Sequence, residues 1–256
     1  MNNYSLPSIG YGTFPQKESL ILTVKCAYNA GYRLFDTSDN YENEKWLGKA
    51  IGDFDDIIII SKFSQPHFAF EVERCFEESS KKLGRAPNAF LLHWPYPFLW
   101  KKIWRQMEIL KLSGKVEHIG VCNFNEKKMK KLLKFCKVKP FINQYERHPY
   151  FQQNHLKNIC DNNGIISMSY SPIGRKNMQL LNDPVLNSLS EKYKKSLCQI
   201  ILKWNVQTGT IPIPASSSYE HISENILIND FSLAHDDIIK INTLERGKRV
   251  RFDPDL

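Results

Sequence analysis

Short apolar segments alternate with longer segments of helical periodicity along most of the chain. Runs of β-branched and aromatic residues predict eight strands, at Ser8–Gly12, Arg33–Thr37, Asp56–Ser61, Asn88–His93, Val116–Val121, Pro140–Gln144, Ile165–Ser169 and Thr210–Pro214. Apolar residues at helical spacing predict helices at Glu18–Ala30, Glu42–Ile51, Phe68–Leu83, Leu99–Ser113, Glu126–Cys136, Gln153–Asn162, Ser196–Thr208 and Tyr219–Leu227. Several of these helices are followed by a glycine, which commonly ends a helix, at positions 31, 84, 114 and 164.

The alternation of strands and helices is typical of βαβ units, which place parallel strands in one sheet. The segment Ile57–Ile60 is apolar at every position, as expected of a strand that is covered on both faces. Eight such units favour a closed (β/α)8 TIM barrel, for which 256 residues is a short chain. The pattern by itself also admits a doubly wound open sheet. Because no repeat or linker is visible, we expect residues 1–256 to form a single domain.

Composition excludes several classes of protein. A chain with 42% hydrophobic and 12% aromatic residues is not disordered. Its longest aliphatic run, Ile57–Ile60, is far shorter than the roughly 20 residues of a membrane-spanning helix. The first ten residues lack the basic and apolar regions of a signal peptide, and the six cysteines form no CxxC pair. We therefore expect a cytoplasmic protein with no membrane partner.

The formal net charge of +8 indicates an anionic partner, such as nucleic acid, a membrane surface or a phosphorylated small molecule. The densest basic segment is Lys127–Lys139, in which Met129 and Leu132 lie at helical spacing. Its lysines are then the solvated face of an amphipathic helix, and no nucleic-acid recognition motif accompanies them, so we expect no nucleic-acid partner. A second basic run, Arg246–Arg251, is a candidate for a phosphate contact.

Four chemically suited side chains lie at the ends of consecutive predicted strands. Asp36 and Tyr41 come at and after the second strand, Lys62 directly follows the third, and His93 closes the fourth. These ends meet at one mouth of a barrel. A phenol, with an ordinary pKa of about 10, needs a nearby cation to stabilise its phenolate. Lys held by Asp would supply that cation, and a neutral His could orient a carbonyl oxygen, so the set predicts proton delivery during carbonyl reduction.

Other constellations do not form sites. His148 and His155 are seven residues apart without a suitably placed carboxylate, so we expect no metal. The glycine-rich segment Gly10–Pro15 lacks the third glycine and the Lys-Ser/Thr pair of a phosphate-binding loop. The set of four also contains no nucleophile with an adjacent base, which argues against acyl transfer.

Six separated motifs resemble those of the aldo-keto reductases, in particular the short bacterial type. They are Gly31–Ile51, Ser61–Phe63, Leu91–Pro95, Gly120–Phe124, Ile142–Tyr150 and Tyr170–Gly174, in the family's order and at sensible spacing. The resemblance implies a TIM barrel that reduces a small aldehyde or ketone to an alcohol, with NADPH bound in extended form. It also implies that Tyr41 is the general acid, that Lys62 and Asp36 set its pKa, and that His93 directs the carbonyl.

The resemblance further implies cofactor contacts at nine positions. In chain order these are Cys122, Asn123, Gln144, Tyr170, Ser171, Ile173, Ser216, Glu224 and Asn225. In the family, the positions of Asn123 and Gln144 hold the nicotinamide carboxamide, and that of Tyr170 stacks on the ring. Phe14 and Trp94 are the implied aromatic walls of the substrate pocket.

Two departures from the family concern the cofactor. Ala215 and His221 stand where the family usually has the Lys and Arg that clamp the 2′-phosphate of NADPH, so use of NADH is a live hypothesis.

A second function is also open: a nicotinamide-binding regulatory or interaction subunit with little turnover, for which an intact catalytic set would be unnecessary. Nothing in the sequence demands a dimer, and we expect a monomer.

Overall fold

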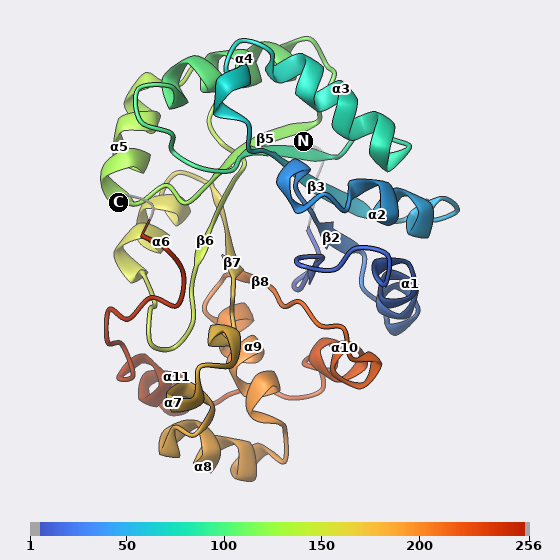
Figure 1. Cartoon of the computed structure of the whole chain (residues 1–256). Helices are drawn as coiled ribbons and strands as arrows, with labels where there is room; N and C mark the ends of the chain where they lie inside the picture. The colour runs from blue at the N-terminus through green and yellow to red at the C-terminus, as the bar shows by residue number, and fades with distance from the viewer. Residues whose placement is uncertain (1–5, 254–256) are drawn as a thin grey trace.

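The computed structural model describes residues 6–253, in which eight strands form one parallel sheet (Figure 1). The strands are β1 (Tyr11–Gly12), β2 (Leu34–Asp36), β3 (Ile58–Phe63), β4 (Ala89–Leu92), β5 (His118–Cys122), β6 (Ile142–Glu146), β7 (Ile166–Tyr170) and β8 (Ile211–Ile213). They pair in sequence order. Gly10 and Gly12 donate backbone hydrogen bonds of 3.0 Å to the carbonyls of Pro212 and Pro214, which joins the last strand to the first. The predicted (β/α)8 barrel is therefore confirmed, and the open sheet is excluded.

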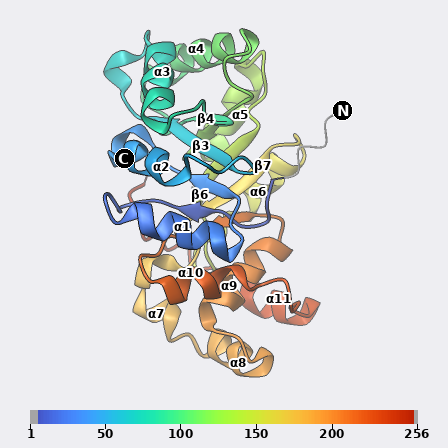
Figure 2. The same cartoon turned by 90° about the vertical axis from the view of Figure 1, so that its right-hand side faces the viewer.

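Helices surround the strands on the outside of the barrel (Figures 1 and 2). They are α1 (Leu20–Ala30), α2 (Glu44–Ile51), α3 (Val72–Leu83), α4 (Trp100–Leu112), α5 (Glu126–Phe135), α6 (Asn154–Asp161), α7 (Met178–Leu181), α8 (Pro184–Tyr193), α9 (Leu197–Gln207), α10 (Tyr219–Ile226) and α11 (His235–Asn242). Three 3-10 turns accompany them, η1 (Asp39–Tyr41), η2 (Pro66–Phe68) and η3 (Gly174–Lys176).

All eight predicted helices are present, but α7, α8 and α11 were not predicted. The first two, of four and ten residues, lie between β7 and β8, where Asn177 and Asp183 cap them through side-chain hydrogen bonds and Pro184 starts the second. Helix α11 has only eight residues, with Asp236 and Asp237 in its first turn. Length alone does not explain the omission of α8 and α11, because α2, α6 and α10 also have eight residues and were predicted.

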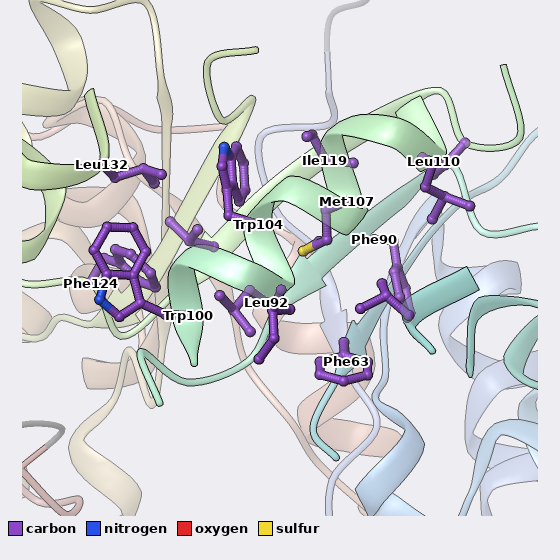
Figure 3. Packing of buried hydrophobic residues seen from close by; sticks show 14 of the residues in the cluster. Phe63, Phe90, Leu92, Trp100, Trp104, Met107, Leu110, Ile119, Phe124 and Leu132 are labelled. Atoms are coloured by element: carbon purple, nitrogen blue, oxygen red, sulfur yellow. The ribbon is translucent and has the colours of Figure 1, made fainter. Parts of the chain in front are cut away.

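The strands are apolar because both of their faces are buried. In β4, Ala89 and Leu91 contribute to the cluster that fills the barrel interior, whereas Phe90 and Leu92 face outward. The outward pair packs with Trp104 of α4 in a second cluster between sheet and helices (Figure 3). This two-sided burial explains the absence of polar alternation in the predicted strands.

Two glycines show why the chain needs that residue at particular points. Gly31 has a φ of 109° and ends α1, where its N–H bonds to the Tyr28 carbonyl. Gly120 lies inside β5, and a Cβ there would be 2.6 Å from the Ile142 carbonyl oxygen of the neighbouring strand. Any side chain at position 120 would therefore separate β5 from β6.

The basic segment lies on the barrel's outer surface. In α5, Met129 and Leu132 are buried, Leu133 and Phe135 pack partly against the same core, and the lysines lie on the more exposed side of an amphipathic helix, as predicted. No helix within residues 6–253 is long and apolar enough to cross a membrane. Within the same residues, no group of three or more His, Cys, Asp or Glu side chains is arranged to hold a metal ion.

Candidate active site

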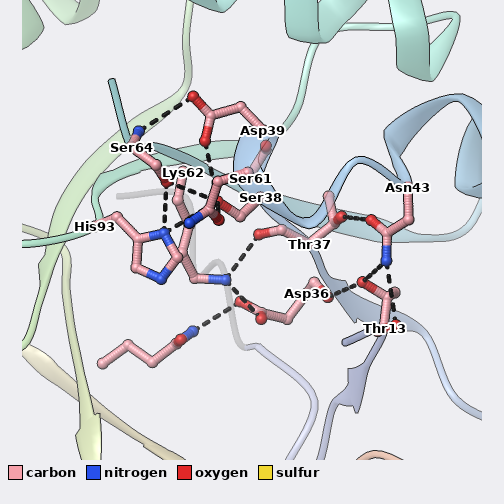
Figure 4. A network of polar contacts seen from close by, with 12 residues as sticks. Thr13, Asp36, Thr37, Ser38, Asp39, Asn43, Ser61, Lys62, Ser64 and His93 are labelled. Carbon is pink, nitrogen blue, oxygen red and sulfur yellow. Dashed lines mark hydrogen bonds and ion pairs between the residues drawn. The ribbon is translucent and has the colours of Figure 1, made fainter. Parts of the chain in front are cut away.

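A buried ion pair joins the ends of β2 and β3. Lys62 Nζ lies 2.6 Å from Asp36 Oδ2 and donates a second hydrogen bond of 2.7 Å to the Thr37 carbonyl (Figure 4). Lys62 was expected to follow the third strand. It lies inside β3 instead, because pairing with β4 continues through Lys62 opposite Leu91 and ends only at Phe63.

The Asp36 carboxylate is saturated by partners from two sides of the barrel. Its second oxygen, Oδ1, accepts a hydrogen bond of 2.7 Å from Gln144 Nε2 in β6. Burial is the largest influence on the pKa of Lys62 and lowers it, but the charge of Asp36, its hydrogen bond to Lys62 and the neighbouring Tyr41 and Cys122 together raise the net pKa above its usual range. Lys62 is therefore a fixed cation at the centre of the mouth.

Tyr41 ends the 3-10 turn η1 that follows β2. Its ring centroid is 5.0 Å from Lys62 Nζ and 5.7 Å from the His93 ring. Burial raises the Tyr41 pKa to about 12, although the Lys62 charge acts in the opposite direction. The expected influence of Lys62 is thus present but smaller than that of burial. Tyr41 is protonated at neutral pH and is available as a proton donor.

His93 directly follows β4, which ends at Leu92. Its Nδ1 is 2.6 Å from Ser64 Oγ and 3.0 Å from Ser38 Oγ, while no described residue forms a hydrogen bond with Nε2. Burial lowers the pKa of His93 well below its ordinary value, and the positive charge of Lys62 adds to that effect. His93 is therefore neutral at neutral pH, with one ring nitrogen anchored and the other open.

The two serines and Asp39 were missed as site residues. Asp39 Oδ2 accepts hydrogen bonds from Ser64 N at 3.1 Å and from Gln65 Nε2 at 3.2 Å. Ser38 Oγ lies 2.9 Å from Ser64 Oγ and donates to Asp39 Oδ1 at 3.2 Å. This network fixes the turn carrying Tyr41 against the end of β3. The sequence signal that could have identified the two serines is their position, one or two residues after the end of an apolar strand.

The residues assigned to the nicotinamide contact the same mouth. Asn123 Nδ2 donates to the His93 carbonyl at 2.9 Å, and Asn123 Oδ1 accepts from Tyr170 OH at 2.7 Å. Asn123 and Ser171 have φ values of 62° and 50°, an uncommon conformation for residues other than glycine. Such strain often occurs at functional sites, and here two instances fall on predicted cofactor positions. Cys122 is buried beside them in the barrel interior.

The positions assigned to the adenosine end lie around β8 and α10. The Ser216 carbonyl accepts hydrogen bonds from Tyr11 OH at 2.6 Å and from Gln16 Nε2 at 3.0 Å, which tie this segment to β1. Asn225 is buried in α10, whereas Ala215 and His221 are exposed. Glu224, which precedes Asn225, is half-buried, and so is Ile173 in the loop after β7.

Two aromatic side chains flank the acid and the histidine. The Phe14 ring is 5.0 Å from the Tyr41 ring and is 38% exposed. Trp94 stacks on His93 with ring centroids 5.9 Å apart and an angle of 18° between the planes. The four predicted catalytic residues and the two predicted pocket walls are therefore neighbours in space.

Comparison with known proteins identifies the family. The sequence profile of the aldo/keto reductase family matches residues 8–246. The chain belongs to the aldo/keto reductase family. Its curated relatives include glyoxal reductase of Bacillus subtilis (strain 168), 36% identical over 99% of this chain and 94% of the relative. Another is 2,5-diketo-D-gluconic acid reductase B of Corynebacterium sp. (strain SHS752001), 36% identical over 96% and 92%.

Solved aldo-keto reductase structures share the barrel over nearly its full length. MGS-M4, an enzyme from a Medee basin deep-sea metagenome library, superposes with a TM-score of 0.95 at 31% identity and covers 100% of this chain and 97% of its own. An aldo-keto reductase of Bombyx mori in complex with NADP has a TM-score of 0.91 at 29% identity, covering 100% and 94%. The family resemblance found in the sequence is therefore confirmed.

Proposed function

We propose that this aldo-keto reductase is an NADPH-dependent carbonyl reductase in which Tyr41 is the general acid. The observation that carries the proposal is the convergence of a protonated phenol, a buried ammonium and a neutral imidazole at one mouth. Within 6 Å of the Tyr41 ring centroid lie both Lys62 Nζ and the centre of the His93 ring. The names of curated relatives include glyoxal reductase and methylglyoxal reductase, which are carbonyl reductases.

The chain's own residues account for the proton and the orientation. When bound, NADPH supplies the hydride that reduces the carbonyl carbon. With the Ser64 hydroxyl donating to Nδ1, His93 carries its proton on Nε2 and donates to the substrate oxygen. Tyr41 gives its proton to that oxygen as negative charge develops on it. The fixed Lys62 cation stabilises the phenolate that remains, and Asp36 holds Lys62 in place.

The residues at the mouth fit a nicotinamide. Gln144 uses Nε2 for Asp36 and, among the described residues, its Oε1 accepts no hydrogen bond, so it can accept from a carboxamide N–H. Asn123 Oδ1 has a second lone pair beside the one used by Tyr170 OH. Tyr170, the last residue of β7, would provide an aromatic face for the nicotinamide ring, and Ser171 and Ile173, which follow it in the chain, would contact the pyrophosphate. Ser216, Glu224 and Asn225 would hold the adenosine end.

The preference between NADPH and NADH rests on an exposed surface. Since Ala215 and His221 are both exposed and neither is a fixed cation, we propose weak discrimination against NADH.

The remaining expectations from the sequence also stay proposals: a single domain over residues 1–256, a monomer, a cytoplasmic location, and no nucleic-acid or membrane partner.

The test is a reductase assay with a matched inactive variant. The purified protein is mixed with NADPH or NADH and a panel of small aldehydes and ketones, and cofactor absorbance is followed. We expect carbonyl-dependent oxidation that disappears in Tyr41→Phe. Binding of NADPH without any carbonyl-dependent oxidation would contradict the proposal and favour the regulatory subunit.

A further inference from the structure

Residues 248–253, the last that the structure describes, form a strap beside the active-site mouth. Glu146, buried at the end of β6, accepts hydrogen bonds from the backbone N–H of Val250 at 2.6 Å and of Arg251 at 3.1 Å. His148 Nε2 lies 3.0 Å from the same carboxylate. Upstream, the backbone N–H of Lys248 bonds to the Tyr150 carbonyl at 3.1 Å. The position of Arg251 is therefore set by a buried acceptor at a barrel strand.

The side chain of Arg251 faces the predicted substrate pocket. Its guanidinium carbon is 5.7 Å from the centre of the Phe14 ring, and that ring is 5.0 Å from Tyr41. The positive charge of Arg251 also contributes to the lowered pKa of His93, which places it within electrostatic reach of the catalytic histidine. Arg251 is half-buried.

The positive charge of Arg251 is not neutralised by the described part of the chain. No carboxylate of residues 6–253 lies within 4.0 Å of its guanidinium. Three acidic residues of the active-site region have other partners: Asp36 binds Lys62, Asp39 accepts from Ser64 N, and Glu146 accepts from the backbone N–H of Arg251. A half-buried guanidinium beside an aromatic ring suits a planar carboxylate, which it can bind through two parallel hydrogen bonds.

We infer that Arg251 binds a carboxylate of the substrate, so that the preferred substrates are aldehydes or ketones bearing a carboxylate several bonds from the carbonyl. We assign the carboxylate and the carbonyl to opposite sides of the Phe14 ring, because this ring is 5.7 Å from the Arg251 guanidinium carbon and 5.0 Å from the Tyr41 ring. A 2-oxo acid, whose carboxylate adjoins the carbonyl, does not meet this requirement. The inference rests on the proposed function, because it names the substrate class of the same site.

The test compares two aldehydes of similar shape. 4-Carboxybenzaldehyde carries the carboxylate across a ring from the carbonyl, and methyl 4-formylbenzoate is its neutral counterpart. We expect wild-type kcat/KM to favour the acid by at least about tenfold, mainly through KM, and Arg251→Met to abolish this ratio. Arg251→Lys keeps the charge without the planar fork and should give an intermediate ratio.

Arg249→Met is the matched control. Arg249 is two residues away in the same strap but lies over Phe151, 4.3 Å from its ring, and 3.9 Å from Asp253. We expect the acid-to-ester ratio of this variant to equal that of the wild type. An equal ratio in wild type and Arg251→Met would overturn the inference. So would a more than threefold weaker NADPH affinity in Arg251→Met, which would assign Arg251 to a cofactor phosphate.

Failure of the proposed reductase function can be distinguished from failure of the inference about Arg251, because only the former leaves the wild type without activity on either aldehyde. If the wild type reduces neither aldehyde, the inference is decided by binding of 4-(hydroxymethyl)benzoate to the protein with NADP+, followed by calorimetry. Binding at least tenfold weaker in Arg251→Met would support a carboxylate site, and equal binding would overturn it.

Discussion

The ends of β2, β3 and β4 differ sharply from the region formed by the segment after β8 and the first turn of α10. At the first, Lys62 and Asp36 are buried and hydrogen-bonded from several directions, and His93 Nδ1 contacts two hydroxyls. At the second, Ala215 and His221 are exposed, and the polar contacts mainly cap α10 or tie the backbone to β1. The chemical groups are thus preorganised, whereas the predicted 2′-phosphate region is open.

The difference indicates which property of the enzyme is tightly specified. A preorganised low-dielectric site gives strong electrostatic effects without reorganisation, so a change there should alter rate by orders of magnitude. Exposed groups are screened by water and salt, so a change at the second region should alter affinity by small factors. Four predictions test this contrast.

The largest effect is expected for Tyr41→Phe. Removal of the proton donor should lower kcat by about 1,000-fold, within the range typical of general acid catalysis. NADPH affinity, measured by fluorescence titration, should change less than threefold because the lost hydroxyl is assigned to the substrate oxygen. If the variant retained more than a tenth of the wild-type kcat, Tyr41 would not be the general acid.

Lys62→Met should affect both rate and stability. The substitution leaves the buried Asp36 carboxylate without its cation, which typically costs about 3–5 kcal/mol. Urea unfolding should show that loss, and kcat should fall by about 100-fold. In the double variant Asp36→Asn/Lys62→Met, stability should partly recover because no unpaired charge remains, while activity should stay low. Recovery of activity together with stability would mean that the pair is only structural.

His93 should make folding stability depend on pH. Its pKa in the folded protein is depressed below the ordinary 6.5, so the unfolded chain binds more protons as pH falls. The contribution is fully present above about pH 6.5 and is lost below it, by about 1.4 kcal/mol per pH unit until the folded pKa is reached. His93→Gln should reduce this slope in urea unfolding at pH 5, 6 and 7. Identical slopes would contradict a neutral buried His93.

The smallest effect is expected at the open region. Ala215→Lys combined with His221→Arg should raise the preference for NADPH over NADH by about three- to tenfold, since exposed charge-assisted contacts are weak. Leu227→Lys, at the exposed C-terminal end of the same helix region, controls for added charge. A change of 100-fold would show that this region is as preorganised as the catalytic end.

The local pattern was sufficient for the framework of the fold. Strand-helix alternation and two-sided apolar strands such as Ile57–Ile60 predicted the barrel, and each predicted strand has its counterpart. The motifs also predicted the residues that meet at the mouth. Strand limits were less certain, as with Lys62, because pairing with β4 rather than local composition decides where β3 ends.

What the sequence determined by itself is the kind of residue at each strand end, since residue type and period are local properties. Only the tertiary structure decided the partners: Gln144 reaches Asp36 across 108 residues, and Glu146 holds Arg251 across 105. The reason is geometric. Closing eight strands into a barrel brings their carboxyl ends together, and the direction of each side chain at that rim depends on strand register, which no local pattern encodes.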